Sequence, residues 1–466
     1  MDRLTVEDML MLWPDDAWPQ EVGAVGALDG GPLLEPDGSL RIDAVRRAIQ
    51  ARLHLVPRLR QVLRVPRRGL GRPVWVDDPG FDIAHHVRVA PLTGSAGETD
   101  LLQAVARLGR QRLDRSRPLW EMWLLPGLPD RRIGLFVRLH HVVADGVAAI
   151  ATVGVFLDQT PDPPAEPMRP WTPGPAPASA ALLADHLRRY ALAGARSMRM
   201  LARPVTSVRR IRAGWRGMRE AFAAVPTPDT SLNRTVGSER TIAVVRGDIG
   251  TVKRIARRHG AKVNDVVLAM TANGLRTLLR RRGEAVDQFP VYVPITLRPA
   301  ASRPSARGNH IAQMIVPLPL GTTDPVQRLR EIAAETARQK AKPHPALGFV
   351  LRGRIARRLL LNVLNRHPVS VTTADLAGPP EPVYLAGSRL LEVFPVVPLI
   401  GRVPIGVGAL SYADHFAVAV VADPAVCPDL DVFVDAARQE LEDLAMRSDV
   451  EPPLVAIDMA TTRPVP

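Results

Sequence analysis

The sequence predicts an α/β protein made of two halves. Segments with the two-residue periodicity of strands alternate with segments of helical periodicity through most of the chain, which is typical of layered sheets and helices. Residues 160–179 contain so many prolines that neither a helix nor a sheet strand fits, so an extended connector is expected there. We therefore assign residues 1–159 to an N-terminal half, 160–230 to a connecting region and 231–466 to a C-terminal half. Each half is expected to be a mixed β-sheet flanked by helices.

The composition is that of an ordinary globular protein with a basic surplus. Of the 466 residues, 46% are hydrophobic and 23% are charged, so a large core can be buried. A net charge of +14 favours anionic partners such as phosphate groups, coenzymes or an acidic membrane face. We find neither a secretory signal nor a run of about 18 apolar residues, which predicts a cytoplasmic protein that is soluble or bound peripherally to a membrane.

The N-terminal half contains both kinds of element. Helical periodicity covers residues 39–63 and 100–113. Alternation typical of strands covers residues 73–78, 81–92 and 132–141, and an apolar helix is expected at 147–157.

An arginine-rich segment follows the connector. Between residues 181 and 222, arginines alternate with apolar residues, and Pro204 divides the segment into two helical pieces. A basic amphipathic helix of this kind can lie on an anionic membrane. It can equally be a linker helix that packs on its own protein and exposes its arginines to solvent. The sequence leaves both interpretations open.

The C-terminal half again interleaves strands and helices. Strands are expected at 241–249, 289–299 and 310–320 and within 404–423. Helices are expected at 249–260, 264–283, 325–341 and 429–448, the first of them stopped by its final glycine.

The strongest candidate for chemistry is the heptapeptide HHVVADG, which contains His140, His141, Asp145 and Gly146 and follows a predicted strand. An imidazole at the end of a strand has a fixed backbone beneath it. The amide dipoles of the helix that starts near Val147 disfavour its protonation, so His141 is expected to stay neutral and to accept a proton. The aspartate suits the helix N-terminus and can also pair with an arginine, and the glycine permits close approach to the backbone. The alternative, a set of satisfied core polar residues, fits this spacing less well.

Other motifs give no competing chemistry. His85 and His86 form a second pair, but no Asp-Gly follows them, so we take them as strand residues with no catalytic role. The single cysteine, Cys427, excludes a disulfide scaffold, and it is far in sequence from the histidine motif and is not expected to be a nucleophile. The sequence contains no P-loop, dinucleotide fingerprint, HExxH or GxSxG motif. With four tyrosines and no recognisable nucleic-acid module, the basic charge alone does not predict nucleic-acid binding.

The histidine motif also carries a family resemblance. HHVVADG resembles the HHxxxDG signature of the coenzyme-A-dependent acyltransferase superfamily, which includes chloramphenicol acetyltransferase and the condensation domains of peptide synthetases. Further segments resemble one branch, the bacterial bifunctional wax ester synthase/acyl-CoA:diacylglycerol acyltransferases, and keep the order of that family over almost the whole chain. They are VEDMLMLWPDD with VGAVGAL, the Pro-Leu-Trp element of SRPLWEMWLL, the Asn-Asp element of AKVNDVVLAM, VYVPITLRP with RGNHIAQMIVPLP, and FPVVPLIGRVPIGVGALSYADHFAVAVVAD.

The resemblance implies two chloramphenicol-acetyltransferase-like halves with the active site at their interface. It implies that His141 is the general base and that His140, Asp145 and Gly146 complete the motif. Asn264 is then expected to donate a hydrogen bond to the reacting carbonyl oxygen. A purely structural role for Asn264, as the cap of the helix that follows, remains the alternative.

The same resemblance implies the substrates and the residues around them. Pro118, Leu119 and Trp120 are expected to form a pocket wall, Asp265 to belong to the substrate site, and Arg298 to pair with the aspartate of the histidine motif. Acyl-CoA is implied as co-substrate, with diacylglycerol or a long-chain alcohol as acceptor and with no separate cofactor and no metal. Contact with an anionic membrane or a lipid droplet is expected through the arginine-rich segment.

One element departs from the family pattern. Where the family usually shows Ser-Asn-x-x-Gly-Pro, residues 374–379 read Ala-Asp-Leu-Ala-Gly-Pro, which replaces neutral donors by the carboxylate of Asp375. Two alternatives therefore stay open. The same base could serve an amine or a small hydroxylated acceptor, or the chain could be a non-catalytic protein bound to a lipid surface.

Overall fold

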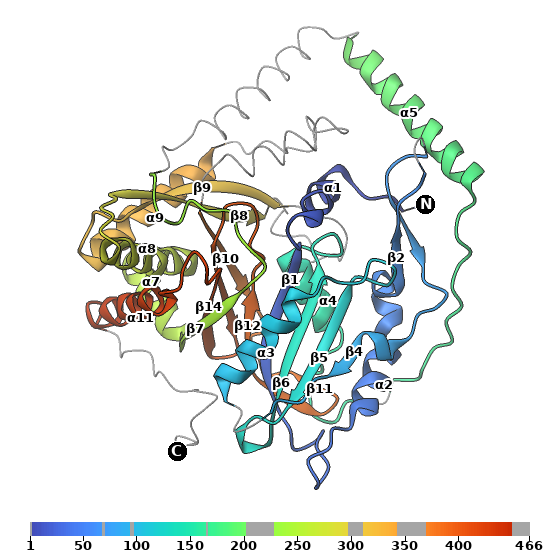
Figure 1. Cartoon of the computed structure of the whole chain (residues 1–466), viewed down its shortest axis with the longest axis horizontal. Coiled ribbons are helices and arrows are strands. Elements are labelled where there is room, and N and C mark those ends of the chain that lie inside the picture. Colours follow the sequence, from blue (N-terminus) through green and yellow to red (C-terminus); the bar gives the residue numbers. More distant parts are fainter. Residues whose placement is uncertain are drawn as a thin grey trace.

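The computed structural model describes residues 2–67, 70–93, 97–164, 166–201, 228–296, 311–342 and 370–449. Two mixed β-sheets stand side by side, with helices around them and at their junction (Figure 1). This arrangement confirms the predicted α/β class with two halves.

The first sheet is formed mainly by the N-terminal half. Its strands run in the order β11-β12-β1-β6-β5-β4, and only β4 and β5 are parallel neighbours. Central β1 and β6 pair over their full length, from Glu21 opposite His140 to Asp29 opposite Arg132. The strand bounds are β1 Glu21–Asp29, β4 Val87–Val89, β5 Trp120–Pro126, β6 Arg132–His140, β11 Tyr384–Leu385 and β12 Ser388–Val396. A separate hairpin pairs β2 Gln61–Arg64 with β3 Val74–Asp77.

The second sheet belongs to the C-terminal half. Its order is β7-β14-β13-β10-β8-β9, with β10 parallel to both of its neighbours and the remaining pairs antiparallel. The strand bounds are β7 Thr241–Asp248, β8 Gln288–Thr296, β9 Ile311–Pro319, β10 Val371–Ala377, β13 Ile405–Tyr412 and β14 His415–Ala422.

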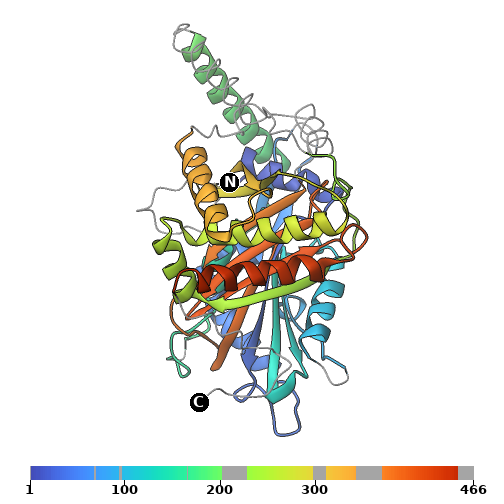
Figure 2. The same cartoon turned by 90° about the vertical axis from the view of Figure 1, so that its left-hand side faces the viewer.

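Helices cover the sheets because each presents an apolar face to them. Figure 2 shows α8 and α11 lying across the second sheet, and Gly274 of α8 allows this close packing, since a Cβ there would lie 2.8 Å from the ring of Phe433. The α3 helix lies at the junction of the two sheets (Figure 1). The helix bounds are α1 Val6–Leu12, α2 Ile42–Arg52, α3 Glu98–Arg110, α4 Gly146–Gly154, α5 Ser179–Leu201, α7 Ile249–Arg258, α8 Val263–Arg281, α9 Pro325–Ala341 and α11 Leu430–Met446.

The C-terminal half contributes two strands to the first sheet. β11 and β12 lie in the C-terminal part of the sequence, but β12 pairs with β1 and so extends the first sheet. A cluster of ion pairs holds β12 against the second sheet and α3. Arg246 of β7 contacts Glu392 of β12 at 2.6 Å and Glu98 of α3 at 2.7 Å. The two sequence halves are therefore not independent bodies in space.

Two predicted elements differ from the observed ones. The predicted helix 39–63 ends as α2 at Arg52, and Pro57 lies in the short 3-10 turns that lead to β2, because proline removes a helical hydrogen bond. The predicted strand at 81–92 begins as a 3-10 turn capped by Asp82, and only Val87–Val89 form a strand. The interpretation of His85 and His86 as strand residues was therefore wrong.

The first predicted piece of the arginine-rich segment is the helix α5, which projects from the body of the protein in both views (Figures 1 and 2). The second piece lies outside the described residues. Within the described ranges, none of the helices is long and apolar enough to cross a membrane.

Candidate active site

The histidine motif lies at the junction between strand and helix that the sequence predicts. His140 ends β6, and a turn from His141 leads into α4. The backbone N–H of His141 donates to the carbonyl oxygen of Gln20 at 2.7 Å, which fixes the residue against the start of β1. His140 is buried, whereas His141 as a whole residue is half-buried, with the Nδ1 atom of its ring shielded from solvent.

The His140 ring is held on both of its nitrogens. The backbone N–H of Val142 donates to His140 Nδ1 at 3.1 Å, so Nδ1 carries a lone pair and the ring proton is assigned to Nε2. His140 Nε2 lies 3.1 Å from Asp15 Oδ1, so the imidazole and the carboxylate are in close polar contact. His140 is therefore engaged in the fold and is not free to act as a base.

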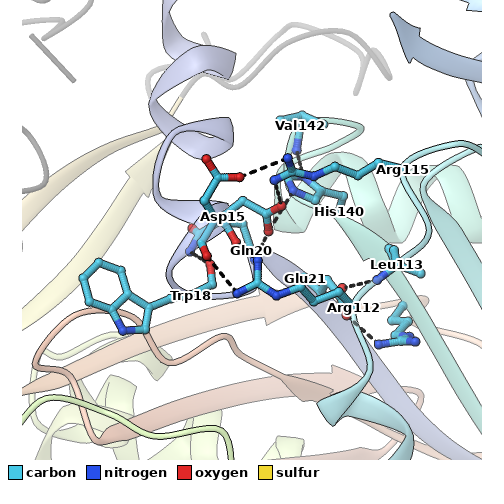
Figure 3. Close-up of polar contacts among 11 residues, drawn as sticks. Asp15, Trp18, Gln20, Glu21, Arg112, Leu113, Arg115, His140 and Val142 are labelled. Carbon is cyan, nitrogen blue, oxygen red and sulfur yellow. Dashed lines mark hydrogen bonds and ion pairs between the residues drawn. The ribbon is translucent and has the colours of Figure 1, made fainter. Parts of the chain in front are cut away.

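Asp15 is the centre of a buried polar network around the motif (Figure 3). It accepts the backbone N–H of Gln20 at 2.9 Å and forms an ion pair with Arg115. Burial opposes ionisation, but the contacts with His140, Arg115 and the Gln20 backbone outweigh it and hold the pKa of Asp15 well below its usual range. Asp15 is therefore a carboxylate at neutral pH.

Asp145 caps the helix α4 as predicted. Its side chain accepts the backbone N–H of Ala148 at 2.9 Å, and the residue is buried. Gly146 allows β10 of the other half to pack closely against the start of α4, since a Cβ at Gly146 would lie 3.2 Å from the side chain of Leu376. Arg298, the predicted partner of Asp145, lies outside the described residues.

The Pro-Leu-Trp element is buried and attached to the histidine strand. The Leu119 carbonyl accepts the backbone N–H of His140 at 3.0 Å. Trp120 donates through Nε1 to the carbonyl of Leu59 at 2.8 Å and stacks on His86, with ring centroids 4.8 Å apart. The Trp120 ring therefore lies in the core, and His86, whose pKa is lowered by burial, supports it.

Asn264 is not the helix cap that the structural alternative required. The N-cap of α8 is Lys262, whose backbone N–H is bound by the Asp265 carboxylate at 2.8 Å. Asn264 lies within the first turn, and its Nδ2 atom is buried with no hydrogen-bond partner among the residues that the structure describes. A buried amide donor of this kind is costly unless a ligand or another group completes it.

Asp265, predicted to bind substrate, uses both carboxylate oxygens within the fold. Oδ2 caps α8, and Oδ1 accepts the hydroxyl of Thr336 on α9 at 2.7 Å. The structure therefore gives Asp265 a role in fixing the start of α8, where Asn264 lies, rather than a carboxylate directed at substrate.

The strand β10 brings the two parts of the site together. Leu376 of β10 packs on Gly146 at the start of α4, and β10 also contacts α8. The neighbouring Asp375 is accessible to solvent yet closely surrounded by protein; desolvation, opposed by Lys340 and aided by Asp265, raises its pKa to about 6. The histidine loop of one half and the start of α8 of the other thus both lie close to β10.

A pocket of about 210 Å³ lies beside this site, at the junction of the halves. Among the described residues, its lining includes Trp18, Glu21 and Arg138 but neither His141 nor Asn264. It therefore adjoins the Asp15 network from the α3 side and is separate from the histidine loop.

Two further features bear on chemistry. Burial raises the pKa of the Cys427 thiol to about 12, so this cysteine stays protonated at neutral pH. In the part of the chain that the structure describes, no group of three or more His, Cys, Asp or Glu side chains is arranged to hold a metal ion.

The network around Asp15 was missed by sequence reasoning. Asp15, Gln20 and Arg115 lie in segments far from the histidine motif along the chain, and no spacing rule connects them to it. The one available signal is that Asp15 belongs to VEDMLMLWPDD, the first of the segments that resemble the family.

Comparison with known families agrees with the observed architecture. Residues 4–267 match the wax ester synthase/diacylglycerol acyltransferase catalytic domain, and residues 307–445 match the WS/DGAT C-terminal domain. A Mycobacterium tuberculosis protein described as "Probable diacylglycerol O-acyltransferase tgs1" is 31% identical over 465 residues, covering 96% of each chain.

Solved structures show the same fold. The wax ester synthase/diacylglycerol acyltransferase from Marinobacter aquaeolei VT8 superposes with a TM-score of 0.67 at 22% identity, covering 96% of this chain and 100% of that one. The first condensation domain of the calcium-dependent antibiotic synthetase gives a TM-score of 0.60 at 18% identity, covering 97% of each. With the catalytic-domain match and the mycobacterial relative, the chain belongs to the wax ester synthase/diacylglycerol acyltransferase family of acyltransferases.

Proposed function

We propose that the protein transfers an acyl group from acyl-CoA to the hydroxyl of a diacylglycerol or a long-chain alcohol, with His141 as general base. An alcohol has a pKa far above 7, so it attacks a thioester usefully only if a base takes its proton as the bond forms. His141 receives that proton and returns it to the departing CoA sulfur. The observation that carries the proposal is the half-buried His141, which follows β6 in the loop that leads to Gly146, where Leu376 of β10 from the other half packs.

Asn264 supplies the hydrogen bond to the oxyanion of the tetrahedral intermediate. Its buried Nδ2 has no partner in the described part of the chain, and its position at the start of α8 adds the positive end of a helix dipole. Both effects favour negative charge on an oxygen placed there. A donor that is already desolvated and oriented needs no reorganisation when that charge develops.

The rest of the mechanism consists of holding the two substrates. In this scheme acyl-CoA and the acceptor alcohol both approach the His141 imidazole, so the acyl group passes directly between them and no covalent acyl-enzyme is required. Arginine side chains of the protein attract the phosphate groups of CoA. An apolar lining holds the acyl chain and contributes roughly 0.8 kcal/mol per buried CH₂. The proposal therefore needs acyl-CoA as a co-substrate and no separate cofactor or metal.

The direct test is an acceptor panel with purified protein. We expect thiol release from palmitoyl-CoA to require diolein or hexadecanol and to yield triacylglycerol or wax ester in equal amounts. Thiol release with an amine or a small polyol alone would overturn the assigned acceptor class. Absence of release with every acceptor would instead support a non-catalytic protein at a lipid surface.

Asp375 favours a second candidate, in which the acceptor carries an amine or a small hydroxylated group. Its carboxylate stands where the family pattern has a neutral side chain, and it lies on β10 next to Leu376, which contacts the histidine loop. The variant Asp375→Asn separates the two candidates within the same panel. A gain with diolein supports the lipid acceptor, and loss of turnover with an amine supports the second candidate.

We also propose that α5 docks the enzyme on an anionic membrane or lipid droplet, on the cytoplasmic side. The helix is anchored at its start, where Asp185 pairs with Arg3 at 2.6 Å and Leu182 is buried against the β2–β3 hairpin. Beyond this point Leu187 is 58% exposed and Tyr190 is 69% exposed. Arginines flank these apolar side chains, as expected for a helix that lies at a charged interface.

The double variant Leu187→Glu/Tyr190→Glu is expected to reduce binding to phosphatidylglycerol vesicles at least about tenfold, because two apolar anchors become charged. Co-sedimentation measures this, with phosphatidylcholine vesicles as a test of the charge contribution. Leu55→Glu is the control, since Leu55 is also an exposed apolar residue but belongs to the 3-10 turn after α2 and not to α5. Equal binding by the double variant and the control would contradict docking through α5.

A further inference from the structure

Three segments around the histidine motif meet at a single buried carboxylate, that of Asp15. Asp15 faces His140 of the histidine motif, pairs with Arg115 just before the Pro-Leu-Trp element, and accepts the backbone N–H of Gln20 (Figure 3). We infer that Asp15 is a positioning residue that fixes the histidine loop in the geometry needed for transfer. This inference rests on the proposed function of His141 as the base.

The first connection runs through the side chain of His140. Because Val142 donates its N–H to Nδ1, the ring proton is assigned to Nε2, and this nitrogen lies 3.1 Å from Asp15 Oδ1. The ring thus links the carboxylate to the backbone of the loop that follows His141. A flipped or doubly protonated ring would set an N–H against the N–H of Val142 and displace this loop.

The second connection runs through the backbone of Gln20. Asp15 Oδ1 accepts the N–H of Gln20 at 2.9 Å, and the carbonyl of the same residue accepts the N–H of His141 at 2.7 Å. Asp15 therefore holds both histidines, one through a side chain and the other through a peptide group. Two short connections leave His141 little freedom to shift.

The third connection joins the loop to the Pro-Leu-Trp element. Arg115 pairs with Asp15, and the Leu119 carbonyl accepts the His140 N–H. Arg115 also contacts Asp16 at 3.1 Å, but Asp16 is exposed whereas only 5% of Asp15 is accessible to solvent. Because a buried carboxylate depends on its partners far more than an exposed one, the coupling passes through Asp15.

Loss of Asp15 should therefore affect turnover rather than substrate binding. A general base displaced by a fraction of an ångström still leaves the substrate sites intact but meets the hydroxyl in poor alignment. For Asp15→Ala we expect kcat to fall about 10- to 100-fold, the range seen when supporting partners of metal-binding histidines are removed, with KM for acyl-CoA changed less than about threefold. Asp15→Asn keeps an acceptor oxygen and should recover part of this loss.

The matched control is Asp16→Asn. Asp16 is adjacent in sequence and shares Arg115 as a partner, but its carboxylate is exposed to solvent, unlike that of Asp15. We expect its kcat and KM to equal those of the unaltered protein. An equal loss in Asp16→Asn and Asp15→Ala would show that only the surface ion pair with Arg115 matters, and would overturn the inference.

The second measurement does not use activity. In protein labelled with ¹⁵N at histidine, the ring shifts of His140, assigned with a His140→Gln sample, should show a protonated Nε2 and an unprotonated Nδ1 in the unaltered protein. Asp15→Ala, or Asp15→Asn if the alanine variant does not fold, should change these shifts, and Asp16→Asn should not.

The two measurements separate the inference from the function on which it rests. An active His141→Ala variant would show that the proposed base is wrong. If Asp15→Ala then alters the His140 shifts but leaves kcat intact, the contact between Asp15 and His140 is structural only. If His141→Ala is inactive but a folded Asp15 variant keeps full kcat, or if Nδ1 of His140 is protonated, the positioning role is wrong while the proposed base stands.

Discussion

Replacing His141 by alanine is expected to abolish acyl transfer while leaving a folded protein. General-base catalysis contributes roughly 10²- to 10⁴-fold, so thiol release from palmitoyl-CoA with diolein should fall by at least that factor. The fold should survive because the contact that fixes residue 141 is its backbone N–H on the Gln20 carbonyl, which alanine keeps. Thermal unfolding of the two proteins should therefore be similar.

His85→Ala is the matched control for this experiment. His85 belongs to the second histidine pair and lies in an exposed 3-10 turn, where its loss should change turnover less than about twofold, as for a surface substitution away from any special feature. Near-normal turnover of His141→Ala would remove the assigned base. In that case the HHxxxDG motif would be structural in this chain.

Replacing Asn264 by alanine is expected to reduce kcat about 10²- to 10³-fold, the loss found when one donor to an oxyanion is removed. The structure makes this a clean test, because Asn264 does not cap α8 and its buried Nδ2 has no partner within the described residues. Removing an unsatisfied donor should leave the free energy of unfolding unchanged or slightly higher.

For Asp265→Ala we expect the opposite result to that for Asn264→Ala, namely a loss of stability. Asp265 accepts the backbone N–H of Lys262 at the start of α8 and the hydroxyl of Thr336, so its loss should lower stability by about 0.5–2 kcal/mol, as for a helix-capping hydrogen bond. Denaturant unfolding of both variants, with kcat measured on the folded protein, distinguishes the two roles. If Asn264→Ala loses stability and keeps kcat, Asn264 is a structural residue.

Local sequence patterns predicted most of the elements that carry the site. The alternation in 132–141 and the Asp-Gly that follows gave β6, the turn and the capped start of α4, because all three depend on neighbouring residues alone. The same reasoning failed for 81–92, where Asp82 caps a 3-10 turn that competes with the strand. The capping alternative for Asn264 is likewise not observed, because the N-cap residue is Lys262 and its backbone N–H is bound by Asp265.

The sequence by itself determined the α/β class, the family and the histidine motif, since these depend on periodicity and on residues close together along the chain. Only the tertiary structure decided that β12 crosses into the first sheet, that Asp15 holds both histidines, and that β10 reaches both α4 and α8. The physical reason is that burial and long-range pairing bring these groups together, and a contact between distant segments leaves no spacing to read in a single sequence.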